Sequence, residues 1–143
     1  MGHELPRIEA WIYSRLTADA TITARIPASA ICAYRAPEGT PLPFIIFSYQ
    51  AGGDVQGLGT ARTLTRAIYQ IKLVCQGAPA EADLAIADRL DTIFQTAVTE
   101  TQQGWQFTSR RERPLSYVET LPASSELIFH LGGLYVIATH PSP

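Results

Sequence analysis

Residues 34–59 read YRAPEGTPLPFIIFSYQAGGDVQGLG, and they combine three kinds of segment in one stretch. The proline-rich part, 36–43, predicts a loop, because prolines cannot donate hydrogen bonds to a sheet. Residues 44–49 predict a short strand that is apolar on both faces, which is typical of a strand that is central in a sheet or covered by another subunit. The four glycines within 50–62 then predict a long flexible arm. A strand that leads into such an arm suits a protein that reaches out to contact a partner.

The remainder of the chain predicts two helices among several strands. Apolar residues at helical spacing indicate one helix from residue 4 or 5 to Leu16, and a second from Pro79 to about Ala97. Strands are expected at 30–34, 63–75, 105–111, 115–121 and 127–139, and Gly132-Gly133 is placed for a bulge or bend. This order predicts an α+β fold, a mainly antiparallel sheet with two helices packed on one face, formed by a single domain, 1–143, with its flexible arm at about 50–62.

Composition limits the possible classes of protein. The chain has 143 residues, of which 46% are hydrophobic and 17% charged, so we expect a packed core. The net charge of −2 argues against general affinity for nucleic-acid phosphates. No apolar run approaches the roughly 20 residues that span a bilayer, and no signal peptide is recognisable, so we expect a cytoplasmic protein without membrane contact. Cys32 and Cys75 have no metal-ligand spacing and are interpreted as small hydrophobic residues rather than functional thiols.

Residues that could carry catalysis are sparse. The three histidines, His3, His130 and His140, are scattered, and no nucleophile elbow or zinc-ligand spacing accompanies them. The glycine arm lacks the third glycine of a dinucleotide fingerprint and is followed by a strand rather than a helix. We therefore expect no catalytic residue, no metal and no cofactor, and a protein that is not an enzyme.

Several side chains are candidates for contact with other subunits. Trp11 lies off the apolar stripe of its helix, so it either covers the edge of the core or contacts a partner. The cluster 110–113, RRER, either forms an intersubunit ion pair with the acidic helix face or is a solvated strand end. The candidate subunit or partner interface comprises Trp11, Asp54, Arg62, Arg66, Asp88, Asp91, Arg110, Arg111 and Arg113.

The pattern as a whole resembles a known family. An N-terminal IEAWIYSRL helix precedes the proline-flanked strand of residues 34–48, followed by TRAIYQIK, a helix with ADRLD and a late LGGLY. Over nearly its whole length the chain resembles the tail completion or tail terminator proteins of long-tailed bacteriophages and prophages.

The resemblance implies a virion structural protein. Such a protein forms a ring, usually a hexamer, at the head-proximal end of the tail tube, where it ends tube polymerisation and joins the tail to the head connector. Its partners would be further copies of itself, the tail tube protein and the connector or other neck proteins, with genomic DNA passing through the lumen without specific binding. It would assemble in the host cytoplasm and reside in the tail or neck of the virion. The alternative is a head-completion or connector adaptor protein of the neck.

Overall fold

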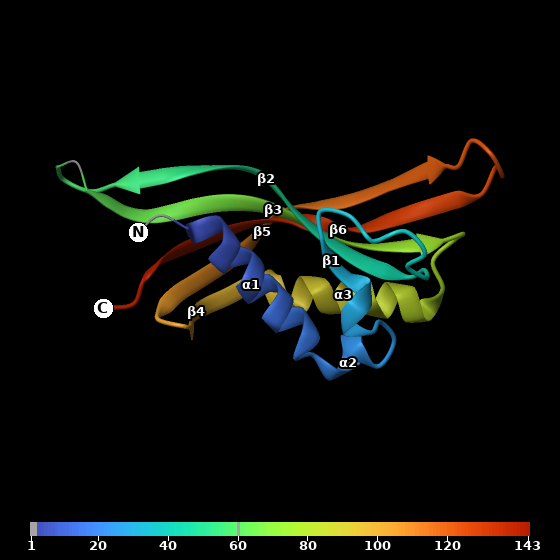
Figure 1. The fold of residues 1–143 in the computed structure, drawn as a ribbon, viewed down its shortest axis with the longest axis horizontal. Coiled ribbons are helices and arrows are strands. Elements are labelled where there is room, and N and C mark those ends of the chain that lie inside the picture. The colour runs from blue at the N-terminus through green and yellow to red at the C-terminus, as the bar shows by residue number, and fades with distance from the viewer. Residues whose placement is uncertain (1–2, 60) are drawn as a thin grey trace.

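A computed structural model describes residues 3–59 and 61–143, without the side chains of residues 96–98 (Figure 1). The helical elements are α1 (Glu4–Thr17), α2 (Ala20–Thr23), the 3₁₀ turn η1 (Ala28–Ala30) and α3 (Glu81–Phe94). The strands are β1 (Ile31–Ala33), β2 (Phe44–Gln56), β3 (Arg62–Gln76), β4 (Thr96–Gln102), β5 (Trp105–Thr120) and β6 (Leu127–Pro141).

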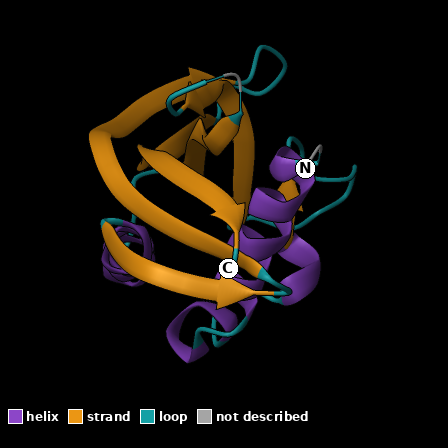
Figure 2. Ribbon diagram, turned by 90° about the vertical axis from the view of Figure 1, so that its left-hand side faces the viewer, coloured by secondary structure: helices purple, strands orange, loops and turns teal. Residues whose placement is uncertain are grey.

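The strands form one sheet in the order β1-β2-β3-β6-β5-β4. The β1–β2 pair is parallel and the other four pairs are antiparallel, so the sheet is mixed. Figure 2 shows that it curls into a half-barrel, accompanied by three α-helices. The prediction of two helices packed on one face of a mainly antiparallel sheet is therefore wrong. Strands of 13 to 16 residues twist along their length, and this accumulated twist curls the sheet.

The prediction of an arm at 50–62 failed for most of its length. Residues 50–56 continue β2, and β3 begins at Arg62, so only a short turn separates the two strands. The register runs from Phe44 opposite Val74 to Gln56 opposite Arg62. Glycines lower strand propensity, but the backbone hydrogen bonds of a long hairpin override that preference here.

One glycine of this hairpin allows close approach of two strands. A Cβ added at Gly52 would lie 2.6 Å from the carbonyl oxygen of Arg66, whereas one added at Gly53 would meet nothing within 4 Å. Gly132 of β6 is similarly placed, because a Cβ added there would overlap the carbonyl oxygen of Ile71. The register of β6 with β3 is unbroken at Gly132 and Gly133, so of the bulge or bend predicted there, a bulge does not occur in this pairing.

The main core lies between the sheet and the helices. Ile8, Ile12 and Leu16 of α1 are fully buried, which confirms the predicted apolar stripe and the helix from residue 4. From α3, Ile86, Leu90, Ile93 and Phe94 join this core. The second helix is shorter than predicted, since residues 96–102 form β4, a strand that the sequence did not indicate.

Trp11 belongs to this core and not to the surface. It is 1% exposed, its ring stacks on Phe107 with centroids 5.1 Å apart, and its edge meets Phe94 at 5.7 Å. Its indole N–H donates to Glu100 Oε2 at 3.2 Å. A helical stripe includes positions three as well as four residues apart, so Trp11 shares the buried face with Ile8. A residue buried to this extent is not accessible to a partner.

We expect Trp11→Ala to destabilise the fold by about 3–5 kcal/mol, because it removes a large buried aromatic side chain. Trp11→Phe keeps most of the ring contacts and loses the indole hydrogen bond, so its loss should be much smaller. Urea denaturation of both variants measures the difference. A loss below about 1 kcal/mol for Trp11→Ala would contradict the burial of this side chain.

Gly52→Ala should destabilise the hairpin by about 1–3 kcal/mol, because the new methyl group overlaps the backbone of β3. Gly53→Ala is the matched control on the adjacent residue, where the added methyl group meets open space. Thermal unfolding of the two variants should separate them clearly. Equal melting temperatures would show that the strands do not approach as closely as described.

The second face of the 44–49 strand is covered from within the same chain. Ile46, Val74 and Ile128 form a small second cluster on the sheet face opposite the helices. Ala36 and Leu42 of the proline-rich loop pack against it. The subunit cover predicted from this doubly apolar strand is thus supplied in large part by the preceding loop.

Candidate assembly surfaces

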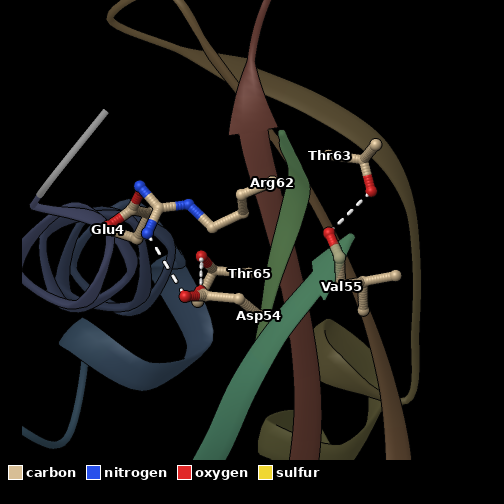
Figure 3. A network of polar contacts seen from close by, with 6 residues as sticks. All are labelled: Glu4, Asp54, Val55, Arg62, Thr63 and Thr65. Atoms are coloured by element: carbon tan, nitrogen blue, oxygen red, sulfur yellow. Dashed lines mark hydrogen bonds and ion pairs between the residues drawn. The ribbon is translucent and has the colours of Figure 1, made fainter. Parts of the chain in front are cut away.

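A polar network fastens the β2–β3 hairpin to the start of α1 (Figure 3). Arg62 Nη2 lies 2.6 Å from Glu4 Oε1, and Arg62 Nη1 lies 3.3 Å from Asp54 Oδ2. The Thr65 hydroxyl donates to Asp54 Oδ1 at 2.9 Å. Asp54 and Arg62, which the sequence placed at a partner interface, therefore engage each other and α1 within one chain.

The protonation of Asp54 reflects this network. The hydrogen bond from Thr65 lowers the pKa of Asp54, desolvation opposes that effect, and the bond and charge of Arg62 lower the pKa further. Glu4 is 7% exposed and is paired with Arg62, which compensates the charge that it buries. The network fixes the orientation of the β2–β3 hairpin relative to α1.

A second predicted contact also lies inside the chain. Arg111 Nη1 is 3.1 Å from Asp91 Oδ1, and the Tyr135 hydroxyl donates to the same oxygen at 3.2 Å. Burial, together with the charge of Asp91, raises the pKa of Tyr135. The predicted intersubunit ion pair between the arginine cluster and the acidic helix face is therefore an intrachain pair for these two residues. Asp88, one turn earlier on α3, is exposed.

The other predicted arginines gather on the sheet face opposite the helices. Arg66 lies opposite Ala138, and Arg110 lies opposite Val136, so the two side chains flank β6 residues that are two positions apart on one face. With Thr108 and Ser109 they line a shallow pocket of about 190 Å³. Arg113 follows on the same face after the β-bulge between Arg111 and Arg113. All three arginines are exposed, so this part of the helix-free face is basic although the chain as a whole has a net charge of −2.

A larger groove lies on the same face, at the far end of the sheet. It has a volume of about 400 Å³ and lies between the loop of residues 34–43 and the end of the β5–β6 hairpin. Its apolar lining includes Leu42, Phe44, Ile46, Val74, Leu121 and Ile128. Sequence reasoning missed this groove, because its walls come from four separate strands and a loop. The one signal was the apolar outer face of the 44–49 strand.

His130 lies beside this groove and is 6% exposed. Its ring stacks on Tyr117 with centroids 4.1 Å apart, and Nε2 lies 3.3 Å from Glu119 Oε1. Burial and then the nearby Lys72 lower the pKa of His130, and Glu119 only partly offsets them. The neutral imidazole is therefore the form that the folded protein favours.

This shift predicts a pH dependence of stability. The unfolded state binds a proton near pH 6.5, whereas folded His130 binds one only at lower pH. The contribution of His130 is complete above pH 6.5 and is lost as the pH falls toward its folded pKa. We expect wild type to lose stability relative to His130→Phe, at up to about 1.4 kcal/mol per pH unit in that window. Urea denaturation of both proteins between pH 7.5 and 5 measures it, and parallel curves would contradict the lowered pKa.

The described residues contain neither a cluster that could hold a metal ion nor a helix that could span a membrane. Within 3–59 and 61–143, no cluster of three or more histidine, cysteine or acidic side chains is arranged to hold a metal ion. None of the helices described has the length and apolar character required to cross a bilayer. Cys32 and Cys75 are free thiols; Cys75 is buried, as expected, whereas Cys32 is only half-buried.

Comparisons with known proteins identify the fold alone. No family model and no curated protein matches this chain. Among the solved structures that are similar, one has a TM-score of 0.59 and 15% sequence identity, over 95% of this chain and 96% of that chain. The likeness therefore extends over the whole sheet and its helices, and says nothing about activity.

Proposed function

We propose that this protein is a structural component of a long-tailed phage virion, which forms a ring at the head-proximal end of the tail tube. There it ends tube polymerisation and joins the tail to the head connector. The observation that carries this proposal is the pair of long β-hairpins that extend from the two ends of the molecule (Figure 1). Each ends in exposed apolar residues, Leu58 on β2–β3 and Leu121 and Leu127 on β5–β6.

Exposed apolar residues at two ends favour association with neighbours on both sides. Single exposed hydrophobic residues are ordinary, but a cluster at a protruding end marks an interaction surface. Tyr117 and Val118 add to the cluster on the β5–β6 hairpin, at 37% and 49% exposure. The resemblance of the sequence to tail terminator proteins supports the same proposal independently of these surfaces.

The charge distribution indicates whether the basic face points toward the lumen or toward protein neighbours. Arginines that face DNA bind its phosphates and release counterions, and this holds the DNA in place. A lumen through which the genome passes without specific binding does not suit the surface formed by Arg66, Arg110 and Arg113. We therefore place the helix-free face against protein neighbours in the ring, the tube or the connector.

Purified protein should form closed rings, with hexamers the first expectation. Native mass spectrometry gives the stoichiometry, and negative-stain microscopy shows whether the assemblies close. Mixing the rings with tail tubes and, separately, with portal assemblies then tests the position in the virion. Binding to tube ends supports a terminator, and binding to the portal side alone supports a connector adaptor. A protein that stays monomeric at all concentrations and binds neither assembly would overturn the proposal.

A further inference from the structure

The tip of the β2–β3 hairpin presents a single apolar side chain. Leu58 is fully exposed and lies between Gly57 and Gly59, in the segment that joins β2 to β3. Figure 1 shows that this hairpin extends to one end of the molecule. Gly59 has a φ of +103°, a conformation that a residue with a side chain rarely adopts. The two flanking glycines contribute no side chains beside the leucine.

The apolar groove near the β5–β6 turn has room for such a tip. Its volume of about 400 Å³ exceeds the cavity of about 150 Å³ that holds a benzene molecule in another protein. Ile46, Val74 and Ile128 form its base and are nearly buried already. Leu121 at its margin is 38% exposed. The apolar groups left for a leucine side chain and its flanking backbone to cover are Leu121 and the half-buried Leu42 and Phe44.

The chain cannot fill its own groove with this leucine. Phe44 and Val74 lie at the groove, and the paired residues Gln56 and Arg62 lie next to the tip. Twelve residues of extended strand separate the two pairs, which corresponds to roughly 40 Å at 3.3 Å per residue. The hairpin is paired along this length, so it cannot fold back. Only a second copy brings a tip to the groove.

The charges on the two surfaces permit this contact. Residues 55–59 carry no charged side chain, and the groove base is also uncharged. Insertion of Leu58 therefore removes no charged side chain from water at the centre of the contact, where an unpaired charge would be most unfavourable. The charged residues of the groove lining are Arg35, Lys72 and Glu119, two cations and one anion, and none of them belongs to the apolar base.

One leucine does not supply a whole interface. A stable contact buries about 800 Å² on each partner, more than one side chain offers. Further apolar surface lies beside the groove, on Tyr34, Tyr117 and Leu127, which are 55%, 37% and 44% exposed. The strands behind the tip would cover these residues as the leucine enters.

We infer that Leu58 of one copy inserts into the groove formed by Ile46, Val74, Leu121 and Ile128 of a second copy. This inference rests on the proposed ring and specifies its subunit contact. Donor and acceptor are different surfaces at opposite ends, so each copy gives one contact and takes one. Such a head-to-tail arrangement closes into a ring when the rotation between neighbours closes.

The test uses two variants, one with a defective tip and one with a defective groove. Leu58→Ser removes the inserted group, and Leu121→Asp introduces a charge at the groove margin. Each variant alone should lose rings, with an apparent dissociation constant raised about tenfold or more, since burial of a leucine is lost. Leu84→Ser, which changes an exposed leucine on α3 away from both surfaces, should keep its rings. Circular dichroism confirms that all three variants are folded.

A mixture of the two defective variants distinguishes this contact from any other. Each mixed pair retains one intact tip and one intact groove, so native mass spectrometry should find heterodimers and no larger assembly. In a Cys32→Ala background, Leu58→Cys with Leu121→Cys in one chain should give a disulfide-linked ladder up to the full ring. Leu58→Cys with Leu84→Cys should give no such ladder.

The outcomes separate this inference from the proposed function. If Leu58→Ser forms the same rings as wild type, the inferred insertion of Leu58 is overturned and the proposed ring still stands. Mixed variants without heterodimers, together with an absent ladder, would overturn it as well. A wild-type chain that forms no ring at all would overturn the proposed function itself.

Discussion

The pairing of β3 along both of its edges is the constraint on which the other elements depend. Its 15 residues bond to β2 on one side and to β6 on the other over almost their full length. A strand of that length spans roughly 50 Å, whereas the 14-residue helix α1 spans roughly 21 Å. The helices therefore cover only part of the sheet, and the remaining strand length extends as hairpins. The polar network around Arg62 then fixes the direction of one hairpin, and the loop of residues 34–43 covers the outer face near the other.

Apart from the exposed Asp88, the predicted charged contacts divide into two groups. One group is used within the chain, where Asp54 pairs with Arg62 and Asp91 pairs with Arg111. The other group, Arg66, Arg110 and Arg113, lies on the helix-free face and shares it with the apolar groove. These intrachain pairs hold the β2–β3 hairpin and α3 in place, so they set the shape that the protein presents to its neighbours in an assembly. The exposed arginines and the groove are the surfaces left to make that recognition.

Strong periodic segments were predictable, and irregular or non-local features were not. The apolar stripe of α1 and the alternation along β3 indicated elements that the structure contains nearly as predicted. The sequence predicts a loop at 50–56, because glycines have low strand propensity and only the partner strand compensates for it. The sequence puts Trp11 off the apolar stripe because Arg7, Ser14 and Arg15 lie around it on the helix. The groove could not be predicted from the sequence, because no local pattern shows that residues as far apart as 42 and 128 share one surface.

The short strand β1 has a consequence for uncontrolled association. It pairs only with residues 45–47 of β2, so within the described chain the outer edge of β2 beyond that point has no neighbouring strand. An open edge is a template on which foreign strands add and fibrils grow. Here a bulge after Tyr49, the two adjacent glycines and the charge of Asp54 interrupt the regular ladder that such addition requires. A protein proposed to end one polymer thus also carries, along this free edge of β2, features that keep it from seeding another.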